Sequence, residues 1–240
     1  MSRHGLSRLV FSSTAAIFGD PERLPIDEDH LKAHVSPYGQ SKWMVEQMLA
    51  DHEAAYGLHS VCLRYFNAAG AAPDGSTGEC HEPETHLIPL VLQVASGRRP
   101  YISVYGEDYD TGDGSCVRDY IHMQDVCAAR LLALRDLLAG RRSACYNLGN
   151  GVGFSVREVI DAARRVTKHT IPSVVEDRRP GDPAGLVADS RRVRQQLGLA
   201  AALHRPRHDH QPRLGVGTPP SASTGMSLPS KHAPLSPQQL

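Results

Sequence analysis

Several features that would assign a chain to a class of protein are missing from this sequence. It has no run of eighteen apolar residues and no signal-peptide pattern, so we expect neither a membrane protein nor an exported one. The formal net charge is zero, and the 22 arginines, against four lysines, are scattered rather than gathered into a basic stripe. We therefore expect a cytoplasmic protein that binds no nucleic acid.

Metal-ligand spacing is lacking as well. The five cysteines stand singly, as reduced cytoplasmic thiols do. Two groups of side chains invite a metal interpretation: Cys80-His81 with His86, and His204 with His208 and His210. Because neither group has a second paired half, we interpret both as loop or tail residues and expect no metal ion.

The most informative segment that is present is Ser36-Pro37-Tyr38-Gly39-Gln40-Ser41-Lys42. Tyr38 and Lys42 lie four residues apart at the start of a predicted helix, so they share one helix face. A nearby ammonium favours the phenolate form of a tyrosine, which can then take a proton from a hydroxyl. The pair alone is weak evidence, because an exposed Tyr and Lys at this spacing can be no more than a solvated pair.

Two apolar runs flank this predicted helix, which covers residues 37–56 and ends at Gly57. Leu9-Val10-Phe11 predicts a buried strand that ends in Ser12-Ser13-Thr14, and residues 60–67 predict a second one. Strand, hydroxyl-bearing loop, helix and strand make a βαβ unit. Thr14 would lie beyond the carboxyl end of its strand, where ligands bind in open α/β sheets, although a capping or turn role is commoner for such a residue.

Seven motifs in a fixed order carry a family resemblance. They are Phe11-Ser12-Ser13-Thr14, Tyr38-x-x-x-Lys42, Arg64-Tyr65-Phe66-Asn67, Gly97-Arg98-Arg99, Val117-Arg118-Asp119-Tyr120-Ile121-His122, Tyr146-Asn147-Leu148-Gly149 and Arg178-Arg179-Pro180-Gly181-Asp182. With them the chain resembles the extended short-chain dehydrogenase/reductase family over roughly residues 8 to 198. Within that family it is most similar to the 4-epimerases of UDP-hexoses.

The resemblance implies a role for each matching position. Tyr38 would be the catalytic base, Lys42 the lysine that favours its phenolate, and Thr14 a contact of the sugar hydroxyl. The cofactor NAD would be held by Tyr38, Lys42, Tyr65 and Phe66. The UDP-sugar would be bound by Thr14, Asn67, His86, Leu87, Tyr105, Arg118, Arg179 and Asp182. His86 stands where family members often carry Asn, and the two arginines suit a diphosphate.

The implied reaction is NAD-dependent epimerisation of UDP-glucose and UDP-galactose at C4 through a transient 4-keto sugar. Dehydration is disfavoured because Thr14 is followed by Ala15-Ala16 instead of an acidic residue. Two alternatives stay open: another NAD-dependent nucleotide-sugar epimerase, or a non-catalytic remnant of such an enzyme. The sequence near Leu186 leaves open whether N-acetylated sugars are accepted.

The chain also departs from the family pattern, which begins with a Gly-rich phosphate turn between a strand and a helix. Gly149-Asn150-Gly151-Val152-Gly153 looks like that turn, but Phe154 takes the place of its last glycine, and we predict a structural turn there. Without the family's first half, the strands would lose neighbours. We therefore expect the isolated chain to be unstable and to bind NAD poorly, and not to form the homodimer that is common in the family.

We predict an α/β fold in three regions. Residues 1–67 would be the C-terminal part of a Rossmann-like, doubly wound parallel sheet. Residues 68–199 would form a smaller α+β substrate-binding region with segments that return to that sheet. Residues 200–240 would be a disordered Pro-rich tail, because residues 201–240 hold seven of the 17 prolines and no aromatic residue. In the middle region we predict a loop over 68–85, strands at 102–105 and 145–148, and helices at 87–96, 123–138, 155–167 and 190–197.

Overall fold

The computed structural model of the chain describes residues 1–72 and 74–199, so the predicted tail lies outside the described residues. The helices are α1 (Pro37–Tyr56), α2 (Leu87–Ala95), α3 (Met123–Leu138), α4 (Val156–Thr167) and α5 (Arg191–Leu197), with short 3-10 helices η1 (Ser2–His4) and η2 (Ala15–Ile17). The strands are β1 (Arg8–Thr14), β2 (His59–Tyr65), β3 (Asn67–Ala69), β4 (Ile102–Tyr105), β5 (Val117–His122), β6 (Ala144–Leu148), β7 (Gly153–Ser155), β8 (Ser173–Glu176) and β9 (Gly185–Leu186). No helix in this described part combines the length and apolar character that a membrane crossing needs.

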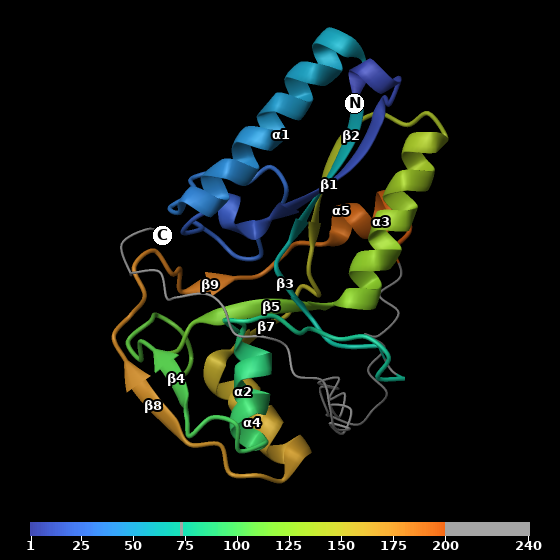
Figure 1. Ribbon diagram of the computed structural model, residues 1–240. Coiled ribbons are helices and arrows are strands. Elements are labelled where there is room, and N and C mark those ends of the chain that lie inside the picture. The colour runs from blue at the N-terminus through green and yellow to red at the C-terminus, as the bar shows by residue number, and fades with distance from the viewer. Residues whose placement is uncertain (73, 200–240) are drawn as a thin grey trace, which may run out of the picture.

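A parallel sheet of β1, β2 and β6, in that order, lies between α1 and α3 (Figure 1). Successive side chains of β2 serve opposite faces, as a strand requires. Cys62 packs under α1 with Leu49, whereas Val61 and Leu63 join the core formed by α3 and α5. The predicted Rossmann-like α/β fold with a parallel sheet is confirmed.

Helix α1 begins and ends at the predicted residues because local signals fix both ends. Ser36 accepts a hydrogen bond from the backbone N–H of Gly39 at 3.1 Å, and Pro37 occupies the first helical position. At the other end Gly57 takes a left-handed conformation, with φ of 66°, which glycine adopts at little cost. Helix α3 and strand β4 also have the predicted bounds.

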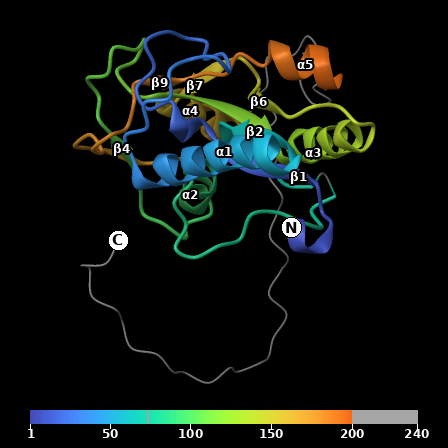
Figure 2. The ribbon, with the colours of Figure 1, turned by 90° about the horizontal axis from the view of Figure 1, so that it is seen from above.

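A second layer of structure lies below the parallel sheet (Figure 1). Strand β5 pairs in parallel with β3 and β9 and antiparallel with β7. Strands β4 and β8 form a separate parallel pair, which shares a core with α2 and α4 through residues such as Val91, Val104 and Ile160. Helices α2 and α4 pack against each other in this lower layer, and the view from above looks down on it past α1 (Figure 2).

Two predicted boundaries in this region are wrong. The predicted strand over 60–67 is two strands, because β2 ends at Tyr65 and β3 starts at Asn67. The predicted loop from Ala68 therefore begins later: Ala68 and Ala69 belong to β3 and pair with Ile121 and His122 of β5. The chain changes sheets at Phe66, and a continuous apolar run does not reveal such a change.

Segments distant in sequence complete the parallel sheet. Strand β6 pairs with β2, and Leu148 at its end is fully buried with Val193 of α5. Within the described residues β1 pairs with β2 alone, so its other edge carries unpaired backbone groups there.

Candidate active site

The carboxyl end of β1 meets the first turns of α1, and this junction places Tyr38 beside Lys42. The Nζ atom of Lys42 donates a hydrogen bond to the backbone oxygen of Ser12 at 3.0 Å and lies 5.7 Å from the centre of the Tyr38 ring. Tyr38 itself is 57% exposed. The arrangement therefore presents a phenol to solvent, with an ammonium that the strand end holds in place.

Thr14 lies at the same strand end, buried, and serves as a cap. Its Oγ1 accepts a hydrogen bond from the backbone N–H of Ala16 at 3.1 Å, which caps η2. This is the capping role that the sequence marks as commoner. A hydroxyl that accepts one bond still has a hydrogen to donate, so Thr14 keeps the capacity to bind a sugar oxygen.

Gly39 explains how closely the start of α1 approaches this turn. A Cβ atom at Gly39 would lie 2.9 Å from the carbonyl carbon of Ala16 and closer still to its oxygen. A side chain there would therefore push the first turn of α1 away from η2. Glycine at this position lets Tyr38 and Thr14 come from two segments that are in direct contact.

A buried ion pair fixes α1 to the sheet beneath these residues. Arg64 of β2 donates from Nε to Oε1 of Glu46 at 3.1 Å and from Nη2 to Oε2 at 2.7 Å. Ser13 donates to the same carboxylate at 2.5 Å, and Arg64 also donates to the backbone oxygen of Glu28 at 3.0 Å. Burial alone would lower the pKa of Arg64, but the hydrogen bonds and charge of Glu46 raise it overall. Arg64 thus keeps its charge, and its bonds to Glu46 hold the helix in register with β1 and β2.

Tyr65 and Phe66 follow at the end of β2. The Tyr65 hydroxyl lies 3.2 Å from Ser12 Oγ, and Arg130 of α3 donates to Tyr65 at 2.8 Å and to Ser12 at 2.7 Å. Phe66 packs against the buried cluster of Ala15, Ile17, Phe18 and Ile26, as do Trp43 of α1 and Leu186 of β9. The structure therefore places these two predicted cofactor contacts at the same sheet edge as Lys42, whose Nζ also bonds to Ser12.

A second group of predicted residues surrounds the ends of β4 and β5. The Arg118 guanidinium pairs with the Asp182 carboxylate. The Arg179 guanidinium carbon lies 3.8 Å from the centre of the Tyr105 ring. Since Tyr105 ends β4 and Arg179 follows β8, its parallel partner, the two residues come from the same end of that strand pair.

Arg178 adds a third guanidinium to this group, 4.1 Å from the centre of the Tyr109 ring. Burial, and next the Asp182 charge, raise the pKa of Tyr109, which the arginines partly oppose. Planar guanidinium groups that rest on aromatic rings and face outward are suited to phosphate oxygens.

The two groups adjoin each other. A Cβ atom at Gly181, between Arg179 and Asp182, would lie 3.5 Å from the Val35 side chain, which precedes the Ser36 cap of α1. Leu186, a few residues later, and Trp43, the neighbour of Lys42, pack against the same buried cluster. The arginine-bearing loop therefore runs past the start of the helix that carries Tyr38.

The remaining predicted substrate contacts lie at the starts of other elements. Asn67 opens β3 and pairs with Tyr120 of β5. Leu87 opens α2 and packs against its apolar core, and His86 precedes it with Nδ1 hydrogen-bonded to Glu79. His86 thus has carboxylate neighbours of its own rather than the arginines.

The Gly-rich segment at 149–153 is a structural turn, as predicted. The Asp119 carboxylate accepts the backbone N–H groups of Asn150 at 2.7 Å and Gly151 at 2.9 Å, and that of Ala188 at 3.1 Å. A phosphate-binding turn must leave such amides for its ligand. Here a carboxylate of the chain already uses them.

Three useful residues escaped the sequence interpretation. Glu46 follows Lys42 by four residues and so lies on the same helix face. Arg64 is a charged residue inside an apolar strand. Together these two features indicate the buried Glu46–Arg64 pair. Arg130 carries no such signal, because its partners Ser12 and Tyr65 lie far from it in sequence.

Comparison with known proteins relates this geometry to characterised relatives. Residues 1–149 match the model of the NAD dependent epimerase/dehydratase family. The UDP-glucose 4-epimerase of Halalkalibacterium halodurans is 51% identical over 198 residues, which are 82% of this chain and 59% of that protein. The corresponding enzyme of Streptomyces lividans is 53% identical over 194 residues, 81% of this chain and 58% of that protein.

Solved structures agree. The UDP-glucose 4-epimerase from Brucella ovis in complex with NAD has 45% identity and a TM-score of 0.79, and the alignment covers 82% of this chain and 61% of that one. The enzyme from Bifidobacterium longum in complex with NAD+ and UDP has 39% identity and a TM-score of 0.80, with 85% and 61% covered. The chain thus spans about three fifths of the length of these relatives.

Proposed function

Since the chain belongs to the NAD dependent epimerase/dehydratase family, we propose that it carries the catalytic and substrate-binding residues of an NAD-dependent UDP-glucose 4-epimerase. It would interconvert UDP-glucose and UDP-galactose by inverting the configuration at C4. The observation that carries this proposal is the exposed Tyr38 beside Lys42, at the start of a helix that the loop with Arg178 and Arg179 passes.

The acid–base step belongs to Tyr38. As phenolate it takes the proton of the sugar 4-hydroxyl while the C4–H bond breaks, which leaves a 4-keto sugar, and it returns the proton when the hydroxyl reforms. The ammonium of Lys42, held by the Ser12 carbonyl, stabilises the negative charge on the phenol. Thr14 donates its hydroxyl hydrogen to a sugar oxygen and keeps its bond from Ala16.

The nicotinamide end of the cofactor fits the same junction. Tyr38, Lys42, Tyr65 and Phe66 all lie at the carboxyl ends of β1 and β2, where parallel sheets bind dinucleotides. NAD, when bound, accepts the C4 hydride and gives it back to the other face of the ketone, so that no net oxidation results. The Gly-rich turn at 149–151 is not proposed as a binding site for the cofactor phosphates, because Asp119 already uses its amides.

The UDP moiety is assigned to the arginine-bearing loop. Arg118 and Arg179 would hold the diphosphate, and the guanidinium of Arg179 is stacked on the Tyr105 ring. A diphosphate that pairs with Arg118 would displace Asp182, whose carboxylate could then accept a ribose hydroxyl. Asn67, His86 and Leu87 complete the proposed contacts.

The test is the conversion of UDP-galactose to UDP-glucose by the purified chain with added NAD, beside a UDP titration and the NAD released by acid. Tyr38→Phe should lower turnover by about 100-fold or more, because general base catalysis is lost, and should leave UDP affinity unchanged. Tyr56→Phe, on the same helix but at its far end, is the matched control and should retain full turnover. UDP-N-acetylglucosamine is assayed in parallel to define the sugar.

Other results would argue against the proposal. Full turnover in Tyr38→Phe would exclude this phenol as the base. A wild-type chain that binds UDP but neither retains NAD nor turns over would support the non-catalytic alternative. For location we propose the cytoplasm, because all five cysteines are free thiols.

A further inference from the structure

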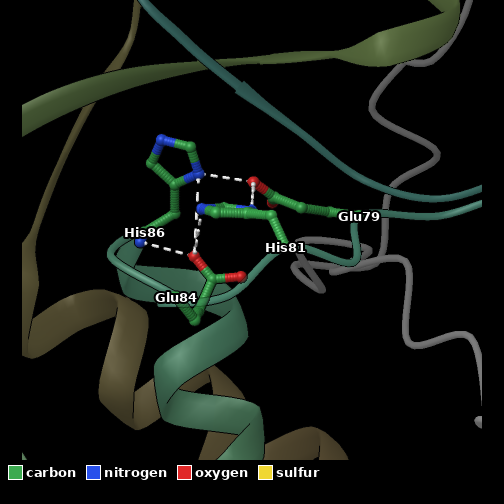
Figure 3. Close-up of side chains that lie close together, drawn as sticks. All are labelled: Glu79, His81, Glu84 and His86. Atoms are coloured by element: carbon green, nitrogen blue, oxygen red, sulfur yellow. Dashed lines mark hydrogen bonds and ion pairs between the residues drawn. The ribbon is translucent and has the colours of Figure 1, made fainter. Parts of the chain in front are cut away.

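Glu79, His81, Glu84 and His86 form a cluster of four possible ligands, of which His86 alone is also a proposed substrate contact. Each offers one ligand atom, and these atoms all lie within 4.8 Å of one another. The residues come from the segment that leads into α2, and the His81 ring lies between the two carboxylates (Figure 3). Two imidazoles and two carboxylates thus converge on one point.

Individual distances show how closely the groups converge. His81 lies 3.5 Å from Glu79 through Nδ1 and 3.4 Å from Glu84 through Nε2. His86 Nδ1 lies 3.8 Å from the same Glu84 oxygen and is hydrogen-bonded to Glu79. A tetrahedral zinc ion with bonds of about 2.1 Å separates its ligand atoms by about 3.4 Å. The observed spacing is close to that of a metal site.

Glu84 is held in place before any ion arrives. Its Oε1 accepts the backbone N–H groups of Thr85 at 2.7 Å and His86 at 2.8 Å, and its side chain is only 8% exposed. A ligand whose position is already fixed loses little conformational freedom when it binds a metal ion. One carboxylate of the cluster is therefore preorganised.

The charge of the cluster favours a cation. Two carboxylate oxygens within 4.8 Å of each other repel. Neutral imidazoles offer lone pairs but no compensating charge, whereas a divalent ion would neutralise both carboxylates. Because imidazole nitrogen selects zinc and similar transition metals over magnesium and calcium, the ligand set is specific.

We propose that Glu79, His81, Glu84 and His86 bind a divalent transition-metal ion, Zn²⁺. This departs from the sequence expectation of no metal, which considered Cys80, His81 and His86 and overlooked the two glutamates. The ion would tie the segment before α2 to the start of that helix. The competing account is a cluster of ion pairs between carboxylates and protonated histidines, which needs no metal.

The experiment is a Zn²⁺ titration by calorimetry at pH 7.5 on EDTA-treated full-length chain. His204, His208 and His210 are replaced by Gln throughout, so that these three tail histidines cannot contribute. We expect one Zn²⁺ per chain. His81→Gln, His86→Gln and Glu79→Gln should each weaken binding by at least about tenfold, because each removes a ligand of the ion.

Two control variants sharpen the assignment. His169→Gln removes an exposed histidine elsewhere, and Cys80→Ser removes the thiol between Glu79 and His81; both should bind Zn²⁺ as the parent does. X-ray absorption of the zinc-loaded chain should show nitrogen and oxygen neighbours without sulfur. Circular dichroism checks that each variant folds as the parent does.

Three results would overturn the proposal: no Zn²⁺ bound by the parent, binding that survives both histidine substitutions, or a Zn–S distance that Cys80→Ser abolishes. Tighter binding at pH 5.5 than at pH 7.5 would also overturn it, because protonated histidines cannot ligate. All of these results are read from metal binding and none from epimerase activity. Because Glu79 and His81 have no part in the proposed function, their variants test the metal site separately from it.

Discussion

Arg64 and Arg118 each face a carboxylate, but their surroundings differ. The Arg64 and Glu46 side chains are each 3% exposed and bond through both carboxylate oxygens, whereas in the second pair Arg118 is 11% exposed and Asp182 is 28% exposed. Removing one partner of a buried pair leaves an uncompensated charge, while an accessible pair gains little from its own attraction. The buried Arg64–Glu46 pair therefore positions α1. The more accessible Arg118–Asp182 pair can exchange its carboxylate for a diphosphate.

The largest expected effect is on folding. Arg64→Ala should lower the free energy of unfolding by about 3–5 kcal/mol, because Glu46 would stay buried without its partner. Urea denaturation followed by circular dichroism measures it. Arg118→Ala is the matched variant and should cost less than Arg64→Ala, because the Asp182 carboxylate that it leaves behind reaches solvent. Equal losses in the two variants would end the distinction between a positioning arginine and a binding arginine.

The next effect concerns binding. Arg118→Ala should weaken UDP binding by about 1.5–3 kcal/mol, or about 10- to 100-fold in Kd, since a charged hydrogen bond to phosphate is lost. Calorimetric titration with UDP checks this. Arg141→Ala breaks another arginine–aspartate pair, between Arg141 just after α3 and Asp136 within it, and should not change the Kd. A Kd that both variants raise alike would point to a general charge effect.

A smaller effect tests the contact between the first turn of α1 and η2 without changing a charged residue. Gly39→Ala should destabilise the fold by about 1–3 kcal/mol, because the new methyl group would overlap the Ala16 carbonyl. Gly112→Ala is the control, since a Cβ there meets no heavy atom within 4 Å, and its change should stay within about 0.5 kcal/mol. Urea unfolding curves of both variants measure these changes. A Gly39→Ala variant as stable as the parent would show that α1 and η2 move apart at little cost.

The smallest effect comes from a pair of intermediate kind, a buried Asp189 with an Arg191 that is 79% exposed. Hydrogen bonds from Arg191 lower the pKa of Asp189 below its ordinary value of 3.8, although burial opposes them. A lowered carboxyl pKa adds stability above about pH 4 that is lost as the pH falls through the folded-state value. The parent should therefore lose unfolding free energy as the pH falls below about 4. Asp189→Asn should reduce that loss by under about 1 kcal/mol.

Urea unfolding at several pH values measures this acid limb. Asp161→Asn, whose carboxylate forms a half-exposed pair with Arg164, is the control and should leave the slope unchanged. An Asp189→Asn variant with the parent's acid slope would show that exposure of one partner is enough to cancel the effect.

The parts of the fold that depend on local signals could be predicted from the sequence. Ser36, Pro37 and Gly57 define α1 because capping and left-handed glycine act within a few residues. Strand β8, by contrast, is exposed along its length and shows no alternation, so its pairing with β4 depends on a partner seventy residues away. Strand β5 was visible only as a motif, since its charged residues conceal the strand.

The same division applies to the candidate site. Tyr38, Lys42 and Thr14 were found from spacing and from their place at a strand end. The contacts that hold them, from Glu46 to Arg64 and from Arg130 to Ser12, cross between elements, and no local pattern encodes such contacts. The four residues of the proposed metal site were missed for a different reason, because they lie in one short segment that has no periodicity.

The turn at 149–151 has a consequence for how glycine-rich motifs are interpreted. Asp119 and a nucleotide phosphate would compete for the same amides, and Asp119 already bonds to them. Because Asp119 belongs to the same chain, it acts at an effective concentration that a free nucleotide seldom reaches. A nucleotide phosphate would have to displace that carboxylate from the amides of Asn150 and Gly151, although Ala188 would still donate to it. Whether a glycine-rich turn is available to a phosphate therefore depends on a residue thirty positions away as much as on the glycines themselves.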